Sequence, residues 1–130
     1  MNQEKDFDRW NEVKKHLDSK AGPMNLVNKG EVWWCSLGVN IGHEQNGKRD
    51  LFDRPVIVLK KFSSDGFLII PITSKIKRGP YYRTFVHGQL IQCALISQIR
   101  FVSNLRLRKW IYKMDVVAFN QIYSAVRDML

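Results

Sequence analysis

Apolar residues near the start of the chain recur at the spacing of one helix face, with charged residues between them. These apolar positions are Phe7, Trp10, Val13 and Leu17. The sequence Ala21-Gly22-Pro23 then ends the pattern, since glycine and proline are favoured just after a helix. The pattern predicts an amphipathic helix over residues 1–20 that packs on the rest of the domain or on a partner.

The middle of the chain consists of short runs of apolar, aromatic and β-branched residues separated by turn residues, which is typical of strands. The predicted strands are Glu31–Leu37, Pro55–Phe62, Phe67–Thr73, Tyr82–Val86 and Cys93–Val102. Ser63-Ser64-Asp65-Gly66 has the composition of a turn and predicts a hairpin between the second and third of these strands. A basic loop, Lys75 to Pro80, separates the third strand from the fourth.

A second amphipathic pattern closes the chain. Asp115 is a suitable N-cap residue, and apolar residues follow it at helical spacing. They are Val116, Phe119, Ile122, Val126 and Leu130. Several short strands with one terminal helix predict a mainly β domain, either a strongly curved sheet or a partly open barrel. At 130 residues the chain has the length of one domain.

The N-terminus lacks the apolar core of a signal peptide, and no apolar run approaches the ~20 residues that span a bilayer. We therefore expect a cytoplasmic protein with no membrane partner. Cys35 and Cys93 lie far apart in strand-like stretches, which favours buried, reduced thiols over a disulfide.

The formal net charge of +9 is unevenly distributed. No acidic residue occurs from Gly66 to Met114, whereas nine lysines and arginines do. This asymmetry favours a polyanionic partner, either a nucleic acid or an acidic protein, over the alternative of a basic solubilising surface.

Most familiar catalytic motifs are missing from the sequence, including phosphate-binding loops, nucleophile elbows and metal-binding histidine or cysteine pairs. The acids around the polar stretch 41–53 are Glu44, Asp50 and Asp53, with no second carboxylate cluster to hold an ion. Cleavage of RNA needs no metal, because the 2′-hydroxyl is an internal nucleophile. Arg54 stands where this polar stretch meets an apolar strand, and its planar group of donors suits a phosphate. Alternatively it pairs with Asp53 or Glu44 and anchors the loop.

Five short blocks, in order, resemble the MazF/PemK-type toxins of bacterial toxin–antitoxin systems, and the resemblance covers about residues 29–130. The blocks are Gly30-Glu31-Val32-Trp33-Trp34, Gly42-His43-Glu44-Gln45, Arg54-Pro55-Val56-Ile57-Val58, Pro71-Ile72-Thr73-Ser74 and Ser97-Gln98-Ile99-Arg100. Residues 1–28, the helix and a linker, lie outside it. Residues 46–53 lengthen the loop before Arg54 relative to shorter family members, so Glu44 is the least secure of the residues carried over.

The resemblance implies a homodimeric, SH3-like, partly open barrel that cleaves single-stranded mRNA at specific sequences without metal or cofactor. A cognate acidic antitoxin would hold it inactive and join it in binding DNA. Arg54 and Thr73 would act at the scissile phosphate, and Glu44 would support them. The residues expected to contact RNA are Trp34, Gln45, Lys75, Lys77, Arg78 and Gln98. The alternative is a non-catalytic member of the same fold, either an RNA-binding module or a toxin with a protein target, as in gyrase inhibitors.

Overall fold

The computed structural model of the chain describes residues 27–38 and 53–130. The predicted N-terminal helix and the loop that contains Glu44 and Gln45 lie outside these residues. The division of the chain at residue 28 therefore stays a prediction. Among the described residues, no helix is long and apolar enough to cross a membrane.

The described residues form seven strands, two short 3-10 helices and one α-helix. The strands are β1 (Glu31–Ser36), β2 (Asp53–Ser63), β3 (Gly66–Thr73), β4 (Tyr82–His87), β5 (Leu90–Leu95), β6 (Arg100–Ser103) and β7 (Leu107–Lys113). The helices are η1 (Ile96–Gln98), η2 (Asn104–Arg106) and α2 (Val116–Met129). The side chain of Asp115 accepts a hydrogen bond from the backbone N–H of Ala118 at 3.1 Å, which confirms the predicted N-cap.

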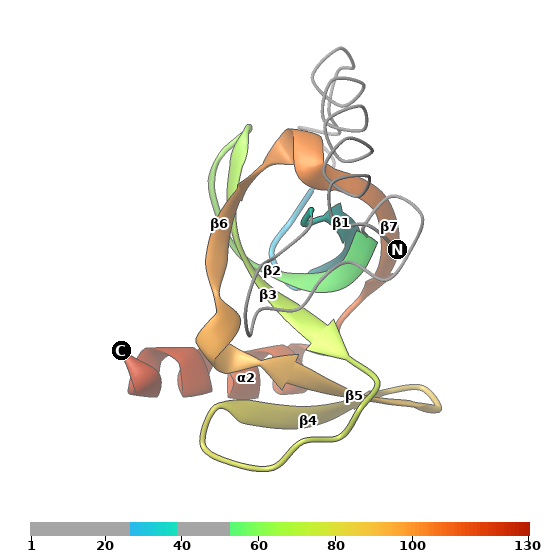
Figure 1. Cartoon of the computed structure of the whole chain (residues 1–130), viewed down its shortest axis with the longest axis vertical. Helices are drawn as coiled ribbons and strands as arrows, with labels where there is room; N and C mark the ends of the chain where they lie inside the picture. The colour runs from blue at the N-terminus through green and yellow to red at the C-terminus, as the bar shows by residue number, and fades with distance from the viewer. Residues whose placement is uncertain (1–26, 39–52) are drawn as a thin grey trace, which may run out of the picture.

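The strands pair in the order β4-β5-β3-β2-β1-β7, with β6 beside β3, and these neighbours in the described part of the chain are antiparallel. Figure 1 shows β1, β2, β3, β6 and β7 curving around a common interior, with α2 and the β4–β5 hairpin at one end. The sheet does not close on itself, which confirms the predicted partly open barrel with a C-terminal helix. Strand β3 belongs to both parts, because Gly66–Ile69 pair with β6 whereas Ile72 and Thr73 pair with β5.

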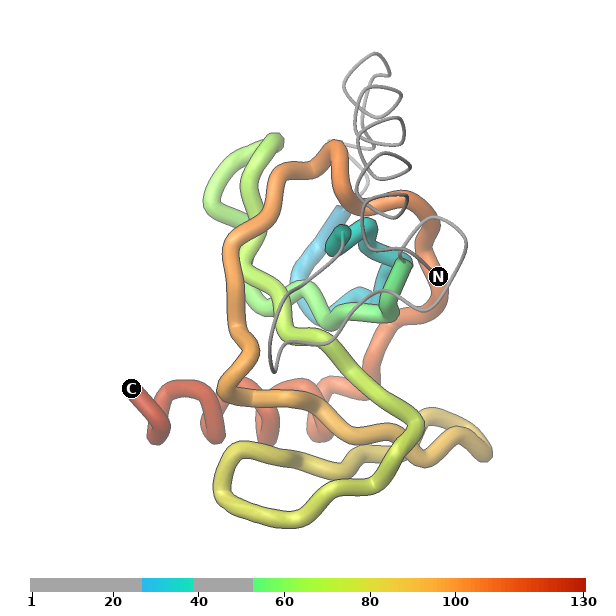
Figure 2. Tube along the Cα trace, viewed as in Figure 1, coloured from blue at the N-terminus to red at the C-terminus, as the bar shows by residue number. Residues whose placement is uncertain are grey.

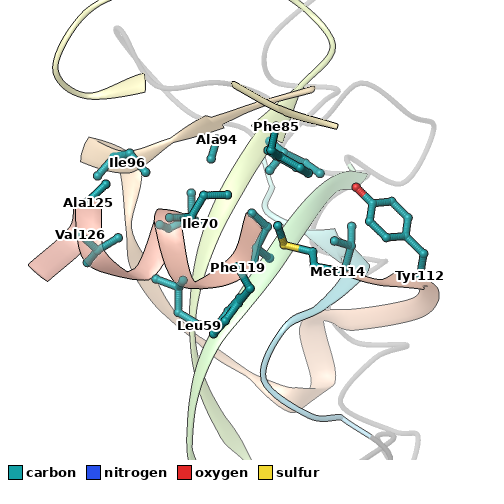
Figure 3. Close-up of a cluster of buried hydrophobic side chains, with 14 residues drawn as sticks. Leu59, Ile70, Phe85, Ala94, Ile96, Tyr112, Met114, Phe119, Ala125 and Val126 are labelled. Atoms are coloured by element: carbon teal, nitrogen blue, oxygen red, sulfur yellow. The ribbon is translucent and has the colours of Figure 1, made fainter. Parts of the chain in front are cut away.

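Alternate residues of the strands enter two separate hydrophobic clusters, as the geometry of a strand requires. The interior cluster lies inside the curve of the barrel strands and comprises Val27, Trp33, Cys35, Leu37, Val56, Val58, Phe67, Ile69, Val102 and Leu107. The helix-side cluster joins the opposite face of β2 and β3 to β4, β5 and α2, and Ile57, Leu59, Ile70 and Ile72 belong to it. Figure 3 shows this second cluster, with Phe119, Ala125 and Val126 of α2 facing the strands.

Two predictions about these elements were wrong, and one strand was missed. The stretch Cys93–Val102 is not one strand, because η1 interrupts it; Figure 2 shows the chain bending sharply there, between β5 and β6. Strand β7 was not predicted. Val116 and Leu130 share the apolar spacing of α2 but are 66% and 89% exposed, so the buried face of the helix is narrower than the pattern suggested.

Candidate active site

A pocket of about 380 Å3 lies where β1, β2, β3 and β5 meet, a volume in the range of small-ligand sites. Its lining residues are Trp34, Asp53, Arg54, Pro55, Ile72, Thr73, Ser74 and Gln92. Three of the residues selected from the sequence, Arg54, Thr73 and Trp34, thus contribute to one pocket although they come from three strands.

Arg54 and Thr73 lie just beyond the last residue pair of the β2–β3 ladder. Val56 lies opposite Pro71, and continuing this antiparallel register by two residues brings Arg54 opposite Thr73 on the same face. The Nη2 atom of Arg54 donates a hydrogen bond to the carbonyl oxygen of Ile72 at 3.5 Å. Both side chains are largely enclosed, with exposed fractions of 2% for Arg54 and 5% for Thr73. Their access to a substrate is therefore through the pocket.

Burial changes the electrostatics of Arg54. Removal from water lowers the pKa of its guanidinium below the ordinary value. A cation in these surroundings interacts more strongly with an incoming anion than a solvated one does, because less water screens it. A lowered pKa also makes it easier for the group to release and recover a proton.

Thr73 is the last residue of β3, and its hydroxyl oxygen accepts a hydrogen bond from the backbone N–H of Lys75 at 3.2 Å. A hydroxyl that accepts one hydrogen bond can still donate its own hydrogen, and Thr73 lines the pocket. The same bond joins the end of β3 to the first residue of the basic loop. In that loop Lys75 and Arg78 are exposed, while Lys77 is half-buried with its Nζ 5.8 Å from the centre of the Tyr82 ring.

Asp53, predicted only as a possible ion-pair partner of Arg54, lines the pocket beside it. Its Oδ1 accepts from the hydroxyl of Ser36 at 2.9 Å, and its Oδ2 accepts from Arg108 Nη1 at 2.7 Å. This aspartate therefore has cross-strand partners of its own on β1 and β7. The alternative interpretation of the sequence was that Arg54 pairs with Asp53 or Glu44 and anchors the loop. Glu44 lies outside the described residues, so its pairing with Arg54 stays a prediction.

Gln92 is the other pocket residue that sequence reasoning missed. Its Oε1 accepts a hydrogen bond from the hydroxyl of Tyr112, which in turn stacks on His87 with ring centres 3.7 Å apart and planes 9° from parallel. The available signal was its place as the one polar residue of β5, Leu-Ile-Gln-Cys-Ala-Leu. The hydroxyl of Tyr112 is buried, and this burial raises its pKa to about 12, so the phenol stays protonated and donates.

The two adjacent tryptophans of β1 have different surroundings, as successive residues of a strand do. Trp33 is 4% exposed in the interior cluster, whereas Trp34 is half-buried and lines the pocket. Gln98 lies in η1, half-buried, and is not among the residues that line the pocket. Cys35 and Cys93 are both buried free thiols, as expected.

Metal-binding side chains are dispersed in the part of the chain that the structure describes. No group of three or more histidine, cysteine, aspartate or glutamate side chains there is placed to hold a metal ion. The charged groups that the pocket offers are the guanidinium of Arg54 and the carboxylate of Asp53. The Arg54 guanidinium and the Thr73 hydroxyl are donors that can hold a phosphate and stabilise added negative charge, whereas the Asp53 carboxylate accepts from Ser36 and Arg108.

Comparison with known proteins assigns a family to this arrangement. Residues 28–130 match the family described as PemK-like, MazF-like toxins of type II toxin–antitoxin systems. No curated protein has significant sequence similarity to the chain.

Solved structures share the fold at low sequence identity. MazF from Deinococcus radiodurans superimposes with a TM-score of 0.65 at 18% identity, over 85% of this chain and 97% of that one. An endoribonuclease from a mycobacterial species gives 0.62 at 13% identity, over 82% and 92% of the two chains. A mycobacterial endoribonuclease in complex with its cognate antitoxin gives 0.59 at 12% identity, over 78% and 92%.

Proposed function

The chain belongs to the PemK-like, MazF-like toxin family of type II toxin–antitoxin systems, and from this premise we propose that it is an endoribonuclease that cleaves single-stranded mRNA without a metal ion. The observation that carries the proposal is the placement of Arg54 and Thr73. Side by side on neighbouring strands, they line one pocket with a partly exposed tryptophan. A cation, a hydroxyl donor and an aromatic surface are the groups that a ribose–phosphate link with a flanking base requires.

The proposed reaction is an internal transesterification. The ribose 2′-oxygen attacks the adjacent phosphorus as it loses its proton, and the bond from phosphorus to the 5′-oxygen breaks. The leaving 5′-oxygen gains a proton, so the products are a 2′,3′-cyclic phosphate and a 5′-hydroxyl. The phosphodiester carries one negative charge at the start, and a second develops on its non-bridging oxygens in the pentacoordinate intermediate; this added charge is what the site has to stabilise.

Arg54 and Thr73 divide this work in the proposal. The Arg54 guanidinium binds a non-bridging oxygen, and its lowered pKa suits it to exchange a proton with a reacting oxygen. The Thr73 hydroxyl donates to a second oxygen of the same phosphate. Glu44 is proposed as a further proton acceptor. DNA lacks the 2′-hydroxyl, so this site would leave it uncut.

The partners of the proposal follow from charge and family. The basic loop, with Lys75, Lys77 and Arg78, begins directly after Thr73 and would follow the RNA backbone out of the pocket. Gln45 and Gln98 are proposed to shape the surfaces beside the RNA. We further propose a homodimer that acts on mRNA in the cytoplasm and is neutralised by a cognate acidic antitoxin.

Cleavage of single-stranded RNA in excess EDTA is the direct test. Wild-type protein should cut the RNA and leave 5′-hydroxyl ends, whereas Arg54→Lys and Thr73→Val should each be slowed about 100-fold or more. Lysine keeps the charge of Arg54 without its group of planar donors, and valine keeps the shape of Thr73 without the hydroxyl. Matched controls are Arg127→Lys on α2 and Thr84→Val on β4, both exposed, which should cut like wild type.

The same assay separates the proposal from its alternative. Protein that binds RNA but never cuts it, with or without added divalent ions, would be an RNA-binding module rather than a nuclease. Cleavage that EDTA abolishes would contradict the metal-independent mechanism. Circular dichroism of each variant shows whether lost cleavage reflects lost folding.

A further inference from the structure

We infer that Gln92 contacts the substrate and reads a hydrogen-bond acceptor on the edge of a nucleobase, and that Tyr112 is the positioning residue that fixes it. The inference rests on the proposed function in that it takes the pocket as an RNA site. It adds a base-recognition element on β5, in the pocket that Arg54 and Thr73 also line. Neither residue belongs to the sequence blocks that pointed to the site.

The Gln92 amide turns its oxygen toward Tyr112. A glutamine amide carries one acceptor oxygen and one donor nitrogen, and the two can exchange places by rotation. The oxygen of Gln92 accepts from Tyr112, and because the phenol stays protonated below about pH 12 it remains a donor at any physiological pH. The bond therefore holds the oxygen on the Tyr112 side and leaves the two N–H donors of Gln92 for other acceptors.

Tyr112 is itself held in place on two sides. It is 8% exposed and belongs to the helix-side cluster, so its ring cannot turn freely. One ring face stacks on His87 at the end of β4. Figure 3 shows the hydroxyl directed to the side on which Phe85 lies, and Phe85 is the β4 residue opposite Gln92 in the hairpin. A rigid phenol at this point fixes the glutamine more firmly than a solvated partner would.

The pocket provides the second feature that a base needs. Trp34 is half-buried and lines the same pocket as Gln92, so a base can stack on the indole while its edge meets the amide. Pro55 and Ile72 supply apolar wall between them. In such surroundings a base that places a donor opposite the Gln92 amide leaves the Gln92 N–H groups without a partner, and the cost of that loss discriminates between bases. A base that places a ring nitrogen or a carbonyl oxygen opposite the amide is the expected ligand.

Two substitutions test the two roles. Gln92→Glu keeps the shape and the oxygen for Tyr112 but replaces the donor by a second acceptor, so it should reverse the preference for an acceptor on the base. Tyr112→Phe removes only the hydroxyl, so it should weaken the preference while the ring stays packed. Exposed residues of α2 provide matched controls, Gln121→Glu and Tyr123→Phe, which should keep the wild-type preference.

The measurement is base preference, read in two ways. Cleavage sites are mapped in a pool of single-stranded RNA with randomised sequence. Binding is measured with short RNAs that carry a 2′-deoxy sugar at the mapped site, so that they cannot be cut. In Gln92→Glu, we expect the ratio of cleavage or binding between the favoured base and the other bases to fall by at least about 10-fold. After Gln92→Ala, Tyr112→Phe should cause no further change, because the two residues act as one unit.

The outcomes distinguish this inference from the proposed function. If Gln92→Glu and Tyr112→Phe cut and bind with the wild-type base preference, the inference is wrong while the nuclease proposal stands. If wild-type protein cuts nothing but binds RNA with a base preference that depends on Gln92, the nuclease proposal fails and this inference holds. Separate effects of Tyr112→Phe and Gln92→Ala that simply add would overturn the positioning role of Tyr112.

Discussion

Asp53, the first residue of β2, forms an ion pair with Arg108 of β7 at 2.7 Å, across the intervening strand β1. The same carboxylate accepts a hydrogen bond from the hydroxyl of Ser36, which lies on the intervening strand β1. Three strands are thus joined at the edge of the pocket. The side chains are 28% and 12% exposed for Arg108 and Asp53, so the pair is partly shielded from water.

Removal of Arg108 should destabilise the fold, because the partly buried carboxylate of Asp53 would lose its charged partner. We expect Arg108→Ala to lower the free energy of unfolding by about 1–3 kcal/mol, measured from urea unfolding. Lys109→Ala removes the same charge from an exposed position on the same strand and should change it by less than about 0.5 kcal/mol. The double variant Asp53→Asn, Arg108→Ala should recover part of the loss; equal loss in both variants would show that the unpaired Asp53 carboxylate is not its cause.

The basic loop should act through charge rather than through base contacts. Alanine at Lys75, Lys77 or Arg78 is expected to weaken binding of uncut RNA similarly for all sequences. Each substitution should reduce the slope of log affinity against log salt by about 0.7, the value for one phosphate contact on a single strand. Arg127→Ala on α2 is the control. An unchanged slope for the loop variants would place the RNA backbone elsewhere.

Gly66 and Phe101 should behave as a coupled pair. A Cβ atom at Gly66 would lie 2.4 Å from Cζ of the Phe101 ring, which packs against Phe62 with ring centres 5.9 Å apart. Gly66→Ala should therefore push the ring outward and cost about 1 kcal/mol of unfolding free energy. In a Phe101→Ala background the same substitution should cost clearly less. Additive losses in urea unfolding would contradict the coupling.

High pH should destabilise the protein through Cys35. Burial raises the pKa of this thiol from 9.0 to about 12 in the folded state, so the unfolded chain releases the proton first. The stabilisation is fully present below pH 9.0 and is lost as the pH rises toward about 12. Tyr112, whose pKa burial also raises, contributes in the same direction.

Urea unfolding at neutral pH and at about pH 11 measures this loss. Cys35→Val removes the ionisable group while keeping an apolar side chain, so the decline with pH should be shallower than in wild type. A decline of equal size in both proteins would show that the thiol is not responsible.

Local signals in the sequence identified some features of the fold correctly. The turn residues between β2 and β3 predicted their hairpin, and Asp115 predicted the start of α2. Strand β7 escaped prediction because Arg108, Lys109 and Trp110 form an exposed run that hides the alternation of its buried residues. The break at η1 was not visible because the residues around it are apolar on both sides.

Local sequence signals likewise identified some residues of the candidate site and missed others. Arg54 and Thr73 were found because each lies in a recognisable block, and the β2–β3 register brings them together. Gln92 and Asp53 were missed because their surroundings depend on Tyr112 and Arg108, which are 20 and 55 residues away in the sequence. No local pattern encodes such contacts, since they exist only after the sheet has curved.

Strand β7 supports the pocket from both ends, with Arg108 bonded to Asp53 and Tyr112 bonded to Gln92. A ribosome releases this strand only after every lining residue has been synthesised. A growing or truncated polypeptide that stops short of β7 would carry all the pocket residues without their supports. We therefore expect such fragments to be harmless to the cell that makes them, whatever the full-length chain does there.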